Sequence, residues 1–199
     1  MKIKNIMTRE EQAKKTKRNQ LIIGILLILL MAMSTVGYAL STRENKDNVN
    51  NKFRYNGIDF IKNSEYWYFN SNGQEFATRY NPKETENISV GFLYLKLNDY
   101  LNEPLYFVGN FPDANYELKR NLYPFASRIQ DACINSINCS IENLPLKNCS
   151  SDNLIIIKEP VKSDKERINQ EGKCIFISAN LENQTIYTDA FLFKILGIN

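Results

Sequence analysis

The chain has 199 residues, of which 43% are hydrophobic and 12% aromatic, and this composition is typical of a folded protein. Its formal net charge of +3 is unevenly divided. The first 20 residues hold seven basic and two acidic side chains (+5), and the remainder hold 18 basic and 20 acidic ones (−2). A slightly acidic main body argues against nucleic acid as a partner, because such binding needs a strongly basic surface.

Residues 21–40 (LIIGILLILLMAMSTVGYAL) form an apolar run without a single charge. A helix of 20 residues is about 30 Å long, which matches the hydrocarbon core of a bilayer. Because the basic residues precede the run, we expect residues 1–20 to be a cytoplasmic tail. The sequence therefore predicts a single-pass protein of the cell membrane, with a transmembrane helix over 21–40, a linker over 41–52 and an extracytoplasmic domain over 53–199.

A cleaved signal peptide is the alternative interpretation of the same run. Residues 21–33 would then be its apolar core, and Gly37-Tyr38-Ala39 would be a cleavage site between small residues. The run continues nearly to Leu40 and the basic segment before it is long. Length therefore favours an uncleaved signal-anchor that stays in contact with membrane lipid.

All four cysteines follow the apolar run: Cys133, Cys139, Cys149 and Cys174. An even number confined to the exported part predicts disulfides in an oxidising compartment. Four cysteines permit three pairings, of which we favour Cys133–Cys139 closing a local loop and Cys149–Cys174 joining two segments. A zinc site is the alternative, but the chain contains no histidine and no C-x-x-C pair.

Sequons for N-glycosylation also lie beyond the apolar run. Asn87-Ile-Ser89 and Asn183-Gln-Thr185 are the two acceptor candidates. Two further sequons, at Asn138 and Asn148, have cysteine in the middle position, where glycosylation competes with disulfide formation.

The sequence of residues 57–80 predicts an antiparallel β-meander. Its three strands are short aromatic-rich runs, and Asn72-Gly73 between the last two is a strong signal for a tight hairpin turn. Asn81-Pro82-Lys83-Glu84 then has the pattern of a helix start and predicts a short helix. The runs expected as strands here are residues 57–61, 65–69, 74–80 and, after the helix, 90–97.

The second part predicts an α/β sandwich with its helices on one face of a sheet. Apolar residues recur at helical spacing from Leu118 to Cys133, and Pro124 should kink or divide that helix. A last helix over 184–196 should stop at Gly197. The expected strands are 105–109, 154–158 and 174–178, with a charged loop over 160–172. The predicted fold class is thus α+β, behind an N-terminal transmembrane helix.

The residue types present exclude most common catalytic centres. Without histidine there can be no Ser-His-Asp, Cys-His or His-ligated metal centre, and no glycine-rich phosphate loop or calcium-loop pattern occurs. We therefore expect no cofactor and no metal. The densest polar group is Arg79, Tyr80, Glu84 and Glu86. Carboxylates there could act as acid and base, but a capped helix start with a surface ion pair explains the same spacing.

Three phrases resemble archaeal single-span membrane proteins of unknown function. They are GQEFATRYNPKETENI (73–88), NDYLNEPLYFVG (98–109) and YTDAFLFKILGI (187–198). Residues 149–158, which lead into an Ile-rich strand, show the same likeness. The resemblance implies a cell-surface or membrane-associated role, and it transfers no functional residues.

Two function classes follow from these patterns. The first is a non-enzymatic binding or structural component of the cell envelope, whose partner is another envelope or membrane protein. The alternative is an extracytoplasmic hydrolase that uses carboxylates, with Glu84, Glu86 or Asp59 as candidates. A signalling receptor fits poorly, because about twenty cytoplasmic residues cannot form an output domain.

Overall fold

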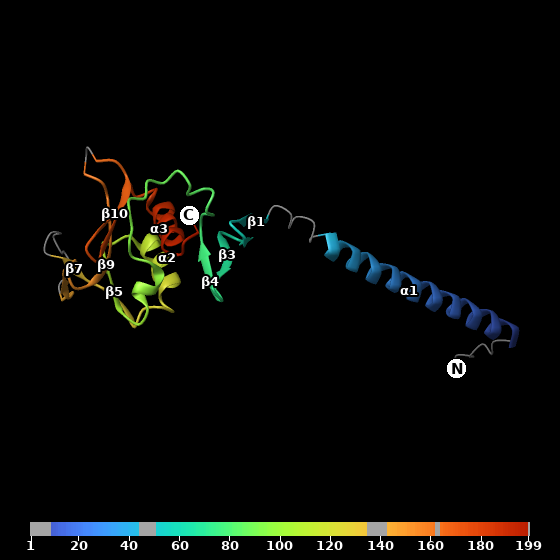
Figure 1. The fold of residues 1–199 in the computed structure, drawn as a ribbon. Coiled ribbons are helices and arrows are strands. Elements are labelled where there is room, and N and C mark those ends of the chain that lie inside the picture. The colour runs from blue at the N-terminus through green and yellow to red at the C-terminus, as the bar shows by residue number, and fades with distance from the viewer. Residues whose placement is uncertain (1–8, 44–50, 135–142, 162–163, 199) are drawn as a thin grey trace. The chain divides into compact units, whose positions relative to one another are not determined.

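The computed structural model describes residues 9–43, 51–134, 143–161 and 164–198, which divide into two compact units, Met1–Asn50 and Asn51–Asn199 (Figure 1). The first unit contains the helix α1 (Arg9–Arg43). Within the described ranges one segment, Ala13–Met33, is long and apolar enough to cross a membrane, and none of its most apolar window is buried. A signal sequence has the same properties, so α1 fits both interpretations of the apolar run.

The second unit begins with an antiparallel meander in the order β1-β2-β3-β4. The first strand was not predicted, and it begins inside the stretch expected to be linker because Lys52 pairs with Ile61. Asn72 and Gly73 turn the last hairpin with φ of 53° and 81°, as expected for an Asn-Gly turn. The strands are β1 (Lys52–Tyr55), β2 (Ile58–Asn63), β3 (Tyr66–Ser71) and β4 (Gln74–Thr78).

The short helix predicted after the meander is wrong, since residues 82–87 form turns. The capping contacts themselves do form: the Asn81 side chain accepts the N–H of Glu84 at 3.1 Å, and Glu84 accepts the N–H of Asn81 at 2.7 Å. A cap without several following turns does not sustain a helix, because nucleation is costly.

The strand predicted over residues 90–97 is also wrong. Only Val90 makes a β-bridge, to Ile168, and the N–H of Tyr94 and Leu95 go to the Gln170 side chain instead of a backbone partner. A single turn of 3₁₀ helix, η2 (Leu97–Tyr100), follows.

A mixed five-stranded sheet with the order β10-β11-β9-β5-β6 forms the rest of the unit. Only β10 is antiparallel to its neighbour. The helix α2 (Pro112–Leu122) connects the parallel strands β5 and β6, and α3 (Gln184–Ile195) follows β11. The strands are β5 (Pro104–Val108), β6 (Arg128–Asp131), β9 (Asn153–Lys158), β10 (Arg167–Glu171) and β11 (Cys174–Ser178). Separately, β7 (Cys133–Ile134) pairs with β8 (Leu146–Lys147).

Two second-half predictions need correction. The helix expected across Pro124 ends at Leu122, and Ile129 and Cys133 lie in strands, because proline cannot continue the helical hydrogen bonds. The stretch expected to be a charged loop contains β10, an edge strand in which only Ile168 is fully buried. Its polar residues are tolerated because an edge strand has less of its surface covered.

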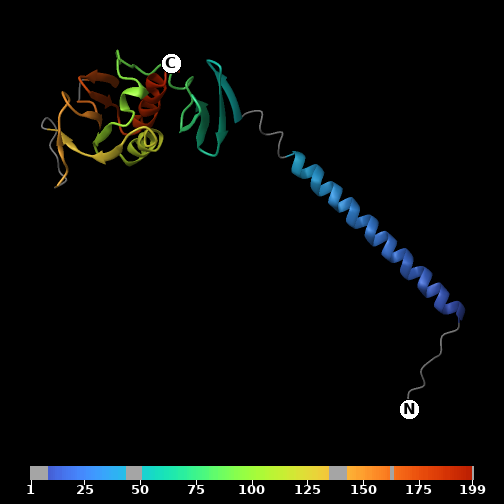
Figure 2. The same cartoon turned by 60° about the horizontal axis from the view of Figure 1, so that its bottom comes forward.

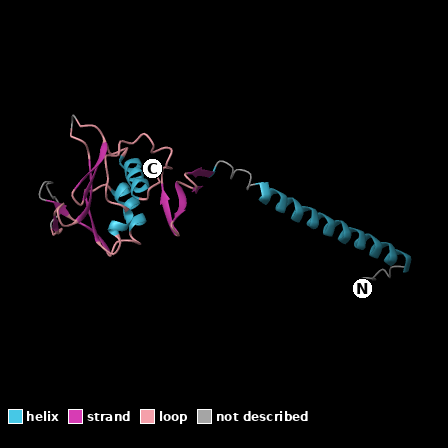
Figure 3. Ribbon diagram, viewed as in Figure 1, coloured by secondary structure: helices cyan, strands magenta, loops and turns pink. Residues whose placement is uncertain are grey.

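The unit has three layers: the five-stranded sheet, the helices α2 and α3, and the meander on the other side of the helices (Figures 2 and 3). Ile155 and Ile157 of β9 belong to the main core with the helices, whereas Leu154 and Ile156 belong to a smaller cluster with Tyr106. The strand β9 is thus buried on both faces, which explains its uninterrupted apolar run.

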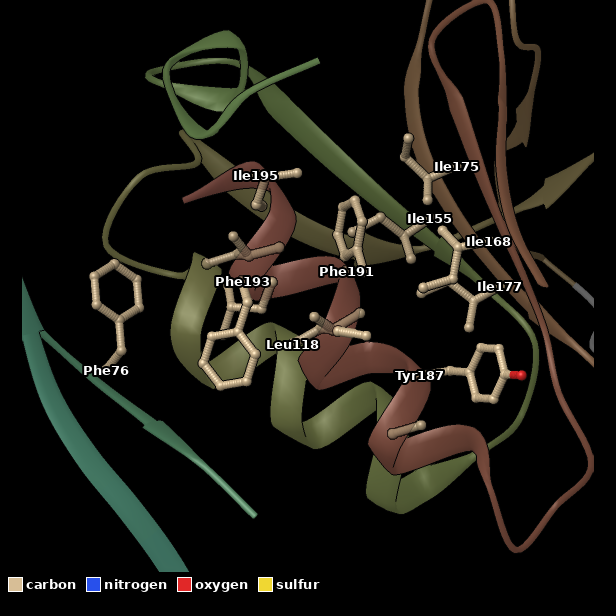
Figure 4. Packing of buried hydrophobic residues seen from close by; sticks show 14 of the residues in the cluster. Phe76, Leu118, Ile155, Ile168, Ile175, Ile177, Tyr187, Phe191, Phe193 and Ile195 are labelled. Atoms are coloured by element: carbon tan, nitrogen blue, oxygen red, sulfur yellow. The ribbon is translucent and has the colours of Figure 1, made fainter. Parts of the chain in front are cut away.

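The helix α3 is apolar on two sides because it lies between two sheets. Figure 4 shows Phe191 beside Ile155 of the five-stranded sheet. Phe193 instead contacts Phe60 and Phe69 of the meander, with ring centroids 6.1 Å and 5.7 Å away. One helix thereby ties the cores of both sheets together.

The predicted pairing of Cys149 with Cys174 is confirmed, with a Cα–Cα distance of 5.0 Å. The bond fastens the first residue of β11 to the segment before β9. For the other predicted pair, Cys139 lies outside the described residues, so Cys133–Cys139 stays a prediction.

Candidate functional site

A pocket of about 390 Å³ lies where the first turns of α2 and α3 meet the segment that follows β4. Residues 111–114, residues 181, 182, 184 and 185, and Arg79 with Tyr80 form its wall. Pro112 begins α2, where the missing N–H of proline costs nothing, and Asn183 precedes the first turn of α3. The pocket thus depends on three segments that are distant in sequence.

The pocket wall combines an ion pair with apolar surface. The guanidinium of Arg79 lies 3.5 Å from the Asp113 carboxylate, and the Arg79 side chain is 32% exposed. A hydrogen bond with Tyr66 is the main cause that raises the pKa of Arg79, so this group stays charged. Leu181, which is 67% exposed, and Phe111 supply apolar surface.

Two completely buried carboxyls hold the backbone of the pocket wall from behind. Glu117 on α2 accepts the N–H of Arg79 at 2.9 Å, and Asp189 on α3 accepts the N–H of Tyr80 at 2.9 Å. The Arg120 guanidinium lies 3.2 Å from Glu117. The end of β4 is therefore bonded to both helices at once.

The two carboxyls bond to the N–H groups of consecutive residues, so they lie near each other between α2 and α3. Burial raises the pKa of Asp189 well above its ordinary value, and the charge of Glu117 raises it further. Burial also raises the pKa of Glu117, against the opposing effect of the Arg120 charge. Two carboxyls in one dry site cannot both ionise cheaply, so the pair favours a shared proton.

The Asn121 side chain bonds to the edge strand β4 at Ala77, just before the Arg79–Tyr80 segment. Its Oδ1 accepts the N–H of Ala77 at 2.9 Å, and its Nδ2 donates to the Ala77 carbonyl at 2.7 Å. The amide thus substitutes for the backbone of a neighbouring strand, and it fixes the register between α2 and the meander.

The structure brings together only part of the predicted polar group. Arg79 and Tyr80 line the pocket, whereas Glu84 caps its own turn and Glu86 is exposed beside Tyr55. Asp59, the other hydrolase candidate, forms an exposed ion pair with Arg54 at 3.5 Å. The three predicted carboxylates therefore lie outside the pocket.

Sequence reasoning missed Glu117 and Asp189, and it assigned Asp113 to capping and turn formation and not to a site. Asp189 carried a usable signal, because it is the single acid in the otherwise apolar stretch of α3, and such a residue has to be paired when the helix is buried. Nothing in the sequence indicated that its partner is Glu117.

The two glycosylation candidates differ in their surroundings. Asn87 is exposed on a turn. The side-chain nitrogen of Asn183 is half-buried and donates to both oxygens of Glu166 at 3.1 Å. Since that nitrogen is the atom a glycan would occupy, the structure favours Asn87 as the acceptor.

The residues described here include no group of three or more His, Cys, Asp or Glu side chains that could hold a metal ion. No protein-family model matches the chain, and neither a curated protein nor a solved structure is significantly similar to it. The resemblance to archaeal membrane proteins stays an interpretation of the sequence, and the function has to be argued from the geometry.

Proposed function

We propose that this chain is a membrane-anchored protein whose residues 51–199 form an extracytoplasmic, non-enzymatic binding domain of the cell envelope. The pocket between α2 and α3 is its binding site, and another envelope or membrane protein is its partner. The observation that carries the proposal is the composition of the pocket wall, in which an accessible arginine lies beside exposed apolar surface. Such a combination suits a protein segment with an apolar and an acidic side chain.

Anchoring in the membrane is supported by α1 and by the charges around it. Its apolar segment Ala13–Met33 has no buried residue in its most apolar window. Seven basic residues precede the run at 21–40, whereas Arg43 and Lys46 directly after it are balanced by Glu44 and Asp47. By the positive-inside bias, the tail would stay in the cytoplasm and the domain would be outside. The disulfide Cys149–Cys174 suits an oxidising exterior.

Binding is favoured over catalysis by the way the carboxyls are used. Glu117 and Asp189, whose raised pKa values would suit acid catalysis, do not line the pocket and are bonded to backbone N–H groups. Asp113 does line it, but its side chain is 71% exposed and lies in ordinary solvent beside Arg79.

The orientation can be measured with single cysteines added to the full chain. Tyr123→Cys places a thiol on a side chain that is 73% exposed in the domain, and Lys17→Cys places one on the N-terminal side of the apolar run. We expect a membrane-impermeant maleimide to label Tyr123→Cys in intact cells, and to label Lys17→Cys only after lysis. The wild type, treated in parallel, gives the background.

If Lys17→Cys were labelled before lysis and Tyr123→Cys were not, the protein would have the opposite orientation in the membrane. Labelling of Tyr123→Cys on a chain that has lost its N-terminal segment would instead establish cleavage of a signal peptide.

Partner binding can be tested with a photo-crosslinking amino acid at position 181 of the wall. Position 123 is the matched control, since it carries a large side chain of similar exposure at the far end of α2, about 15 Å along the helix from the pocket. In intact membranes we expect a discrete adduct from position 181 that is absent from position 123. Adding Arg79→Ala should weaken it severalfold. Equal adduct patterns from both positions would contradict the proposal.

Hydrolysis is the second candidate, because Asp113 and Glu182 both line the pocket. The two functions separate when both acids are replaced by their amides. A carboxylate hydrolase would lose its turnover, whereas a binding domain would still form the adduct at position 181.

A further inference from the structure

Glu117 and Asp189 approach each other from two different helices, and each carboxyl uses one oxygen for a backbone N–H. The remaining oxygens, Glu117 Oε2 and Asp189 Oδ1, are buried and receive no other donor in the described ranges. The two carboxyls hold the N–H groups of consecutive residues in a dry site, so one proton placed between these oxygens would satisfy both of them.

The positive charges that face the pair come from two elements. Arg120 on α2 forms an ion pair with Glu117. Arg79, which follows β4, forms its ion pair with Asp113. Tyr66 of β3 lies under both guanidinium groups, at 5.9 Å and 4.4 Å from its ring. Among the described residues only Arg120 makes an ion pair with either acid, and two full negative charges would therefore exceed the positive charge in direct contact with them.

We propose that Glu117 and Asp189 share one proton and act as a pH-sensitive latch that fastens the Arg79–Tyr80 segment to α2 and α3. With the proton in place, the two helices stay together and both backbone N–H groups are held. When the proton leaves, repulsion between the carboxylates pushes the middle turns of α2 and α3 apart and releases the segment. The latch is a property of the fold, and it stands whatever the pocket binds.

The sign of the pH dependence follows from where the proton is held. The latched state keeps the shared proton up to a higher pH than an opened or unfolded chain does. In the opened chain an aspartate has its ordinary pKa of about 3.9. Opening therefore releases a proton, and raised pH favours opening. Between the pKa of the opened chain and the higher pKa of the latched pair, the equilibrium constant for opening should rise up to about tenfold per pH unit.

The test uses the full chain in detergent micelles between about pH 5 and about pH 9. Hydrogen exchange of the peptide containing Arg79 and Tyr80 reports on the latch, expressed as a protection factor that corrects for intrinsic pH effects. Trp67, the single tryptophan, gives a second signal, because it pairs with Thr78 next to the latch. We expect protection at Arg79–Tyr80 to fall by more than tenfold and the Trp67 emission to shift.

Asp189→Asn keeps the shape of the side chain and removes its charge, so its protection should be nearly independent of pH. Glu117→Gln is a second variant of the same kind, should the first fail to fold. The matched control is Asp131→Asn, which removes a surface carboxylate paired with Lys119 and should titrate like the wild type.

Infrared spectra of the wild type alone complete the test, because a protonated carboxyl has its own C=O stretch. A band at neutral pH that disappears as protection falls supports the latch. Its absence at neutral pH would overturn the proposal, as would protection in the wild type that does not change with pH.

Discussion

Replacing Phe193 by alanine should lower the free energy of unfolding by about 3–5 kcal/mol, which is the usual cost of removing a phenyl ring from a packed core. The ring is completely buried, and it joins α3 to the meander through Phe60 and Phe69. A domain of this size has a total stability of about 5–15 kcal/mol, so the loss is a large share. Chemical denaturation of the full chain in micelles, followed by Trp67 fluorescence, measures it.

Phe92→Ala is the matched control for that experiment. It is the same chemical change at a side chain that is 86% exposed. Because little surface is buried there, the free energy of unfolding should change by no more than about 0.5 kcal/mol. If the two variants were equally stable, the contact between helix and meander described here would be wrong.

Removing the disulfide with Cys149→Ala and Cys174→Ala should cost about 3 kcal/mol. The bond closes a loop with a sequence separation of 25, and the constraint acts mainly on the unfolded chain. The unfolded variant should therefore expose more surface, which raises the dependence of stability on denaturant concentration. Denaturant titrations of the oxidised wild type and the double variant measure both quantities.

Reduced protein supplies the control for the disulfide. Once reduced, neither wild type nor variant contains the bond, so any remaining difference reports the lost sulfur atoms, including the buried sulfur of Cys174. If the reduced proteins differed as much as the oxidised ones, the stabilisation would come from packing and not from the cross-link.

Some elements could be predicted because a local pattern was sufficient. The short runs that became β9 and β11 are rich in isoleucine and too short for helices, and both are buried in the five-stranded sheet. The Asn72-Gly73 turn and the end of α3 at Gly197 follow from positive φ angles that these residues accept most readily.

Other elements could not be predicted, because their partners are far away in sequence. Ile129 fits a helical spacing with Leu118, yet it lies in β6 because β5 offers a parallel partner. The polar sequence of β10 predicts a loop, yet the segment forms a strand because β11 pairs with it over five residues. In both cases hydrogen bonds supplied by another segment outweigh the local pattern.

The sequence by itself determined the apolar helix, the α+β class and the meander's hairpin, since each depends on neighbouring residues or on composition. It left three pairings open for the four cysteines, and the structure selected Cys149–Cys174 among them. Only the tertiary structure decided the candidate site. Glu117 and Asp189 are 72 positions apart in the chain. They approach each other because α2 and α3 pack together on one face of the sheet, and there the two carboxyls hold the N–H groups of consecutive residues.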